Sequence, residues 1–194
     1  MIYLASLSPR RCELLEQINV KYQQVAVNVD ETPQAQEEPQ DYVIRLALAK
    51  ARAGQMFTTY PVLGADTAIV CDEQLFGKPS DKDDAKQMLR QLSGRSHQVM
   101  TAVALVTTIE RVRLSISKVY FRHLTESEIE AYIATGEPFD KAGSYAIQGQ
   151  GSIFIKRIKG SYSGIMGLPL YETAMLLAEI GILSAVINEV KNRF

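Results

Sequence analysis

Serine and arginine side chains near the start of the chain could bind an anion. An apolar run is followed by the segment SLSPRR at residues 6–11. This pattern predicts a short strand, a loop, and a helix that begins at Pro9 after the N-cap residue Ser8. Unpaired N–H groups of the first helical turn and the guanidinium groups of Arg10 and Arg11 suit a phosphate. The alternative is an ordinary surface helix, in which two arginines at this end are mildly destabilising.

Acidic residues in two other segments could bind a cation. Asp66 interrupts an apolar segment, residues 62–70, and a buried carboxylate without a partner is costly. Asp30 and Glu31 follow another strand-like segment and would lie beside Asp66 if the two strands are neighbours. Paired carboxylates suit a hard cation such as Mg²⁺, which also takes phosphate oxygens. The alternatives are a turn or local ion pair at Asp66 and a solvated acidic loop at Asp30 and Glu31.

Two lysines and a glutamine are further candidate ligands. Lys50 lies on the polar side of a predicted helix, and Lys78 lies in a loop where Gly77 permits close approach of a ligand. Gln148 lies in the glycine-rich segment 143–151, and its amide offers both a donor and an acceptor to the edge of a base. The alternatives are solvated surface lysines and a hairpin loop without a ligand.

Composition excludes several classes of protein. The chain carries 21 basic and 22 acidic residues, for a net charge of −1, so no global field attracts nucleic acid or an anionic membrane. Cys12 and Cys71 are too few for a disulfide framework or a zinc site, and His97 and His123 are isolated. No Walker A or GxGxxG motif is present. Without a signal-like N-terminus or a run of about 18 apolar residues, a soluble cytoplasmic protein is expected.

The elements that must position these side chains alternate in the first half of the chain. Apolar patterning predicts strands over residues 2–5, 22–27 and 62–70. Helices are expected to begin near Pro9 and Gln40, with Gly54 ending the second of them. This alternation predicts an α/β core with parallel strands.

The second half of the chain has a different pattern. An antiparallel pair is predicted at residues 98–106 and 112–121, so the sheet should be mixed. A helix over 81–92, a capping box at 125–128, a strand over 152–158 and a closing helix over 168–180 complete the expected elements. We expect one domain over residues 1–194, with the helix after the capping box beginning a second lobe.

Eight short segments run through nearly the whole chain in an order typical of one enzyme family. In chain order they are SLSPRR (6–11), DE (30–31), LALAKA (46–51), GADT (64–67), GKP (77–79), AGSY (142–145), IQG (147–149) and GLP (167–169). Together they closely resemble the Maf family of nucleoside triphosphate pyrophosphatases. The resemblance implies cleavage of a nucleoside triphosphate to its monophosphate and pyrophosphate. It also implies the two-lobed α/β architecture of the inosine triphosphate pyrophosphatases, with the active site between the lobes.

Three residues resemble the branch of the family that acts on dTTP and UTP. They are Arg10, Thr67 and Gln148, where the branch acting on 7-methyl-GTP has Trp, Gln and Glu. A glutamine amide can pair with the carbonyl and N–H edge shared by uracil and thymine. Leu7 is a departure, because the family usually has a small or polar residue there.

The resemblance suggests a mechanism and a set of site residues. The phosphate-binding residues are expected to be Ser8, Arg10, Arg11, Lys50 and Lys78. A divalent cation, Mg²⁺ or Mn²⁺, held by Asp66 and Glu31 would lower the pKa of a bound water. Asp66 would orient or deprotonate this water for attack on the α-phosphorus.

The biological role has two interpretations. The resemblance suggests removal of modified nucleotides such as 5-methyl-UTP and pseudo-UTP, together with a link to arrest of septum formation. The alternative is a nucleotide-binding regulator of cell division with little or no turnover. A homodimer is expected, since dimers are the commonest soluble assembly, and neither nucleic acid nor membrane is an expected partner.

Overall fold

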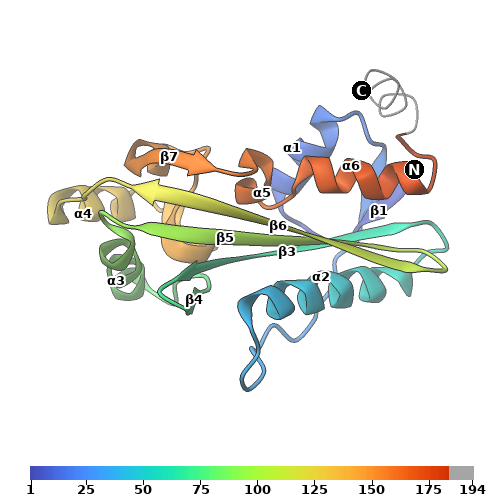
Figure 1. Cartoon of the computed structure of the whole chain (residues 1–194), viewed down its shortest axis with the longest axis horizontal. Coiled ribbons are helices and arrows are strands. Elements are labelled where there is room, and N and C mark those ends of the chain that lie inside the picture. Colours follow the sequence, from blue (N-terminus) through green and yellow to red (C-terminus); the bar gives the residue numbers. More distant parts are fainter. Residues whose placement is uncertain (184–194) are drawn as a thin grey trace. The chain divides into compact units, whose positions relative to one another are not determined.

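The computed structural model of the chain describes residues 1–183, which fall into two compact units (Figure 1). Unit 1 comprises residues 1–66, 101–115 and the described chain from Gly167 onward. Unit 2 comprises residues 67–100 and 116–166. Three long strands, β3 (Val62–Cys71), β5 (Ser96–Val106) and β6 (Glu110–Phe121), each pass along the chain from one unit into the other. The last part of the expected domain, residues 184–194, lies outside the described residues.

Unit 1 contains the parallel part of the sheet. Its strands follow the order β2-β1-β3-β5-β6, and β1 is parallel to both β2 and β3. The remaining elements of the unit are β1 (Ile2–Leu4), α1 (Pro9–Gln17), β2 (Tyr22–Gln24), α2 (Pro39–Gln55) and α6 (Leu170–Glu179). Strands β5 and β6 are adjacent and joined by residues 107–109. The predicted parallel strands and mixed sheet are therefore confirmed.

Helix α2 packs directly on strand β3, and α6 covers the opposite face of this part of the sheet (Figure 1). The apolar face of α2 is buried, including Val43 and Leu46. Gly64 makes close packing possible, because a Cβ atom there would lie 2.4 Å from the carbonyl oxygen of Ala47 and 2.7 Å from the amide nitrogen of Ala51. The absence of a side chain at Gly64 therefore brings the backbone of α2 against the strand.

Unit 2 has a core rich in aromatic residues. Strand β4 (Gln74–Phe76) is antiparallel to β3, and β7 (Ile155–Lys159) is antiparallel to β6. Its helices are α3 (Lys82–Leu92), α4 (Glu126–Ala134) and α5 (Tyr162–Met166), with 3-10 turns at Glu137–Asp140, Ala142–Ser144 and Gln150–Phe154. The buried cluster includes Leu89, Phe121, Tyr132 and Phe154.

The capping box is confirmed, and three expected boundaries are wrong. Thr125 accepts a hydrogen bond from the Glu128 N–H group, and the Glu128 carboxylate accepts one from the Thr125 N–H group. Gly54 does not end α2, because the helix continues to Gln55 while Gly54 packs against β3. A Cβ atom at Gly54 would lie 2.8 Å from Cγ1 of Val62, so this glycine serves packing and not a turn.

The other two wrong boundaries concern strands. The strand expected over 22–27 ends at Gln24, because its partner β1 ends at Leu4. The strand expected over 152–158 begins at Ile155, since residues 150–154 form a 3-10 turn that places Phe154 in the core. Among the described residues, no helix combines the length and apolar character that crossing a membrane requires.

The two histidines have opposite environments. His97 is 2% exposed, and its Nε2 atom lies 2.7 Å from the hydroxyl oxygen of Tyr145. Burial lowers the pKa of His97 to about 4. His123 is exposed. His97 is therefore a neutral core residue.

The contact at Gly64 predicts a cost for the smallest added side chain. We expect Gly64→Ala to lower the free energy of unfolding by about 1–3 kcal/mol, because the added methyl group overpacks the α2–β3 contact. Urea unfolding measures this loss. The control is Gly77→Ala, since a Cβ atom at Gly77 meets nothing within 4 Å. Equal stabilities of the two variants would contradict the close contact.

Burial of His97 predicts a pH-dependent stability. An unfolded histidine binds a proton near pH 6.5, whereas native His97 stays neutral down to about pH 4. The unfolded state thus binds more protons between these values, and stability falls as the pH drops from about 6.5 toward 4. We expect His97→Gln to lose less stability than the wild type between pH 7.5 and 5 in urea unfolding. An unchanged pH dependence in His97→Gln would argue against this origin.

Candidate active site

The serine–arginine loop after β1 is fixed by hydrogen bonds within unit 1. The Ser6 hydroxyl oxygen accepts hydrogen bonds from the Ser8 N–H group at 3.2 Å and from Nη1 of Arg11 at 3.1 Å. Nε of Arg11 donates to the Gly167 carbonyl oxygen at 2.8 Å. The guanidinium group of Arg11 thus ties the loop to the segment before α6.

Helix α1 begins as expected and leaves its first turn without a side-chain cap. Ser8 occupies the N-cap position and Pro9 the first helical position, but the Ser8 side chain makes no capping hydrogen bond. Arg10 lies half-buried in the same turn. Burial lowers the pKa of Arg11, as does the positive charge of Arg10, whereas the charge of Asp66 opposes this shift. The loop therefore concentrates positive charge at a helix N-terminus, as anion binding requires.

Lys50 joins the two carboxylates that the sequence analysis expected to lie together. Its Nζ atom lies 2.6 Å from Oδ1 of Asp66 and 2.6 Å from Oε1 of Glu31. The side chains of Lys50 and Asp66 are 13% and 10% exposed, whereas that of Glu31 is 54% exposed. Three residues that are distant in sequence thus meet in unit 1 around one ammonium group.

The charge of Asp66 is balanced by cations on two elements. Burial raises the pKa of the Asp66 carboxyl, while Lys50 on α2 and Arg11 on α1 oppose the shift. Glu31 also raises the pKa of Asp66, because two carboxylates repel each other.

In the part of the chain that the structure describes, no group of three or more histidine, cysteine, aspartate or glutamate side chains is placed to hold a metal.

The loop that carries Glu31 is positioned by side chains of α2 and by Glu37, which lies just before this helix. The Tyr42 hydroxyl donates to the Glu31 carbonyl oxygen at 3.0 Å. Arg45 donates to both carboxylate oxygens of Glu37, at 2.5 and 2.7 Å, and to the Thr32 carbonyl oxygen at 3.2 Å. These bonds fix the backbone at Glu31 and at the residue that follows it.

Asp30, the other acidic candidate in this loop, has a local role. Its Oδ1 atom accepts a hydrogen bond from the Thr32 N–H group at 2.9 Å. This is the turn-forming bond typical of aspartate. The geometry thus brings Glu31, and not Asp30, to Lys50 and Asp66.

The remaining candidates lie in unit 2. Thr67 follows Asp66 in β3 and is half-buried, whereas Lys78 and Gln148 are exposed. The loop of Lys78 is held by a hydrogen bond from the Gly143 N–H group to the Gly77 carbonyl oxygen at 3.0 Å. Two of the segments singled out in the sequence are therefore neighbours within this unit.

The side chains that position the candidates are not among the residues predicted from the sequence. Ser6, Tyr42 and Arg45 hold the two loops of unit 1 through contacts 5 to 13 residues apart. Tyr42 lies eight residues, roughly two turns, before Lys50, and Arg45 lies three residues after Tyr42, so Tyr42 is a neighbour of both along the helix surface. This spacing is the one sequence signal that could have linked them to the site.

Comparison with known proteins places these features in a family. A model described as Maf-like protein matches residues 1–180. A dTTP/UTP pyrophosphatase of Alkalilimnicola ehrlichii is 52% identical in an alignment of 188 residues that covers 93% of each chain. Another of Xanthomonas oryzae pv. oryzae is 51% identical over 188 residues, covering 93% of this chain and 99% of that protein.

A solved structure supports the fold. The HAM1 protein from Coxiella burnetii covers 92% of this chain and 98% of its own, with a TM-score of 0.54 and 14% identity. The expected mixed α/β architecture is thereby confirmed. From the match over residues 1–180 and the identities near one half, we conclude that the chain belongs to the Maf-like protein family.

Proposed function

We propose that this protein hydrolyses dTTP and UTP to the nucleoside monophosphate and pyrophosphate. The observation that carries the proposal is the meeting of Lys50, Asp66 and Glu31 beside residues 6–11, the Arg11 loop. This arrangement offers cations to phosphate oxygens and carboxylates to a metal-bound water. The choice of substrate rests on relatives of about 50% identity that are named dTTP/UTP pyrophosphatase.

The phosphate groups are bound by the first turn of α1 and by lysine side chains. Ser8, Arg10 and Lys50 of unit 1 supply hydrogen-bond donors, and Lys78 is a further expected phosphate ligand. Arg11 donates to Ser6 and Gly167, so its main contribution is a fixed positive charge and a rigid loop. These charges offset the charge that develops on the departing pyrophosphate.

The carboxylates of Asp66 and Glu31 fit a divalent cation. Both already converge on one positively charged atom, Nζ of Lys50, and carboxylate oxygens are the ligands that Mg²⁺ and Mn²⁺ prefer. A bound divalent cation would lower the pKa of water and neutralise phosphate charge. Asp66 and Glu31 are the residues that would hold it, and Lys50 would then pair with substrate phosphate.

Asp66 acts on the attacking water. Its carboxylate orients the water toward the α-phosphorus and accepts a proton from the water. The water oxygen forms a bond to the α-phosphorus as the bond between the α-phosphorus and the pyrophosphate oxygen breaks. Lys50 and Arg11 favour the charged form of the carboxylate, because they oppose the rise in its pKa that burial causes. Tyr42 and Arg45 contribute indirectly, since they fix the loop that carries Glu31.

Substitution of Asp66 tests the catalytic assignment. We expect Asp66→Asn to reduce kcat by about 100-fold or more, because the shape remains while the base and its charge are lost. Pyrophosphate release from dTTP with Mg²⁺ measures the change. Asp72→Asn is the control, since Asp72 lies just beyond β3 and pairs with Arg95 at the surface. More than about a tenth of wild-type kcat in Asp66→Asn would exclude a base role.

Substitution of Gln148 tests the base selection. We expect Gln148→Glu to lower kcat/KM for dTTP and UTP by about tenfold or more, because a carboxylate cannot donate a hydrogen bond to the base carbonyl. The matched control is Gln91→Glu, which makes the same change at an exposed site on α3 of unit 2. Equal effects of the two substitutions would indicate a general charge effect and not base recognition.

A panel of nucleoside triphosphates separates the enzyme from the regulator hypothesis. Pyrophosphate release is measured with Mg²⁺ or Mn²⁺ for standard nucleotides and for 5-methyl-UTP and pseudo-UTP. Fast turnover of pyrimidine substrates supports the proposal, whereas binding without turnover supports a nucleotide-binding regulator. A preference for purines would contradict the role of Gln148. The homodimer, the cytoplasmic location and the link to septum formation stay predictions from sequence and resemblance.

A further inference from the structure

The loop that carries Gln148 is anchored at its start by a buried tyrosine. We define this base loop as residues 146–151. The hydroxyl oxygen of Tyr132 on α4 accepts a hydrogen bond from the Ala146 N–H group at 3.1 Å. Tyr132 is 4% exposed, and its ring packs against Phe154 with centroids 5.0 Å apart. The start of the base loop is thus attached to a side chain that the core of unit 2 holds in place.

The end of the base loop is anchored by a carboxylate. Oε2 of Glu137 accepts a hydrogen bond from the Gln150 N–H group at 2.9 Å, and Oε1 accepts one from the Gly151 N–H group at 3.2 Å. The Tyr132 hydroxyl donates to the same Oε1 atom at 2.7 Å. The two anchors are therefore linked, and one tyrosine–glutamate pair holds both ends of the loop.

Glycines allow the loop to approach this pair closely. A Cβ atom at Gly149 would lie 2.4 Å from both carboxylate oxygens of Glu137, and one at Gly151 would lie 2.7 Å from the Tyr132 hydroxyl oxygen. Side chains at these positions would push the backbone away from its hydrogen-bond acceptors. The Tyr132–Glu137 pair can therefore bind the loop backbone because Gly149 and Gly151 have no side chains.

The charge of Glu137 is suited to this role. Partial burial would raise the pKa of the carboxyl, but the hydrogen bonds from Tyr132, Gln150 and Gly151 outweigh it, and the pKa is lowered. A carboxylate that accepts several hydrogen bonds holds its donors more strongly than a neutral group does. The anchor therefore stays charged and binds the loop near neutral pH.

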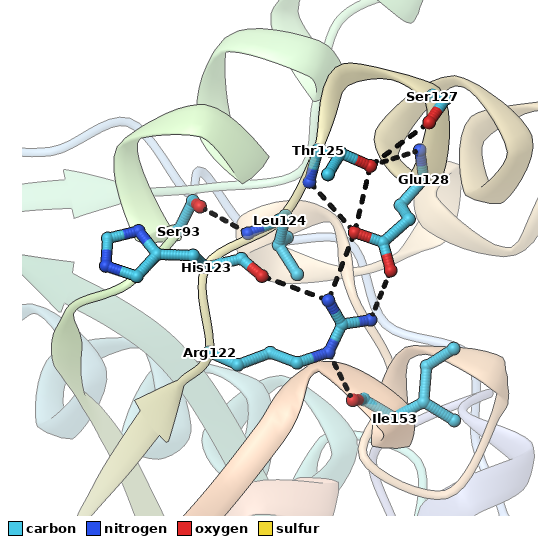
Figure 2. Close-up of polar contacts among 8 residues, drawn as sticks. All are labelled: Ser93, Arg122, His123, Leu124, Thr125, Ser127, Glu128 and Ile153. Atoms are coloured by element: carbon cyan, nitrogen blue, oxygen red, sulfur yellow. Dashed lines mark hydrogen bonds and ion pairs between the residues drawn. The ribbon is translucent and has the colours of Figure 1, made fainter.

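A second network fixes the chain just after the base loop (Figure 2). Nε of Arg122 donates to the Ile153 carbonyl oxygen at 3.0 Å, and its Nη2 atom lies 2.7 Å from Oε1 of Glu128. The Arg122 N–H group also donates to the Phe154 carbonyl oxygen at 2.9 Å. The base loop is consequently held between fixed points on both sides, while the Gln148 side chain is exposed within it.

We propose that Glu137 and Tyr132 are positioning residues that set the placement of the Gln148 amide and thereby the selection of thymine and uracil over cytosine. This inference rests on the proposed function. An amide group can present either its donor or its acceptor by rotating. Thymine and cytosine differ in the donor and acceptor at adjacent positions of one edge. A fixed backbone holds the amide at one distance and angle from the base and beside unchanging neighbours, which limits the alternative placements in which a rotated amide pairs with cytosine.

The test compares substrate discrimination in two variants. In Glu137→Gln, an amide N–H₂ group faces backbone N–H donors, so at least one anchor bond is lost. Tyr132→Phe keeps the ring packing and removes only the hydroxyl that joins the anchors. For both, we expect the ratio of kcat/KM for dTTP to that for dCTP to fall by about tenfold, mainly through KM for dTTP. Inhibition by inorganic tripolyphosphate, which has no base, should stay within about twofold of wild type.

Matched controls remove the same chemical groups elsewhere in unit 2. Tyr145→Phe deletes a buried hydroxyl that contacts His97, and Glu130→Gln changes a carboxylate that pairs with Lys86 on the surface. Both should keep the wild-type dTTP to dCTP ratio. Hydrogen exchange at the amides of Ala146 and Gln150 should become faster in the anchor variants only.

The outcomes separate this inference from the proposed function. If Gln148→Ala loses discrimination while both anchor variants keep it, the positioning role is wrong and the proposed function stands. If the wild type turns over neither dTTP nor UTP, the proposed function fails and the selection role fails with it. Unchanged hydrogen exchange in the anchor variants would overturn the anchoring itself, whatever the activity.

Discussion

The close contact between α2 and β3 is the constraint on which the candidate site depends. Gly64 lets the helix backbone lie against the strand, with Ala47 and Ala51 at the contact. Lys50 precedes Ala51 in the helix, and Asp66 lies two residues after Gly64 in the strand. The close contact therefore leaves only a short distance between the Lys50 ammonium group and the Asp66 carboxylate. A buried carboxylate without such a partner would be costly. The packing of small residues thus determines where the charged groups of unit 1 can be.

The parallel pairing of β1 with β3 adds the second half of this arrangement. Leu4 lies opposite Leu63, so the carboxyl end of β1 lies beside the part of β3 that carries Asp66. Loops that follow parallel strands gather at this edge, where ligands of α/β proteins commonly bind. The Arg11 loop and the Lys50 ion pairs are therefore neighbours because of strand order, and their charges influence one another.

Local patterns predicted much of the fold and part of the site. The sequence predicts the N-cap Ser8, the capping box at Thr125 and the helices, because each of them depends on residues a few positions apart. The end of α2 was not, because Gly54 is explained by a strand residue, Val62. Likewise, the sequence indicated Asp66 and Glu31 as partners but did not indicate that Lys50 would lie between them. The anchors of the base loop depend on contacts 13 or 14 residues apart, which no periodicity reports.

Two carboxylates of the chain are used in opposite ways. Asp66 is buried among charged side chains, and burial raises its pKa. Glu137 accepts hydrogen bonds from a tyrosine and two backbone N–H groups, which lower its pKa. The first environment suits a group that exchanges protons or cations, and the second suits a permanent structural anion.

The bond from Arg11 to the Gly167 carbonyl oxygen has a consequence for synthesis of the chain, because its two residues are 156 positions apart. A nascent chain on the ribosome carries Arg10 and Lys50 long before it contains Gly167, so it has the charges for binding nucleotides without the loop geometry for using them.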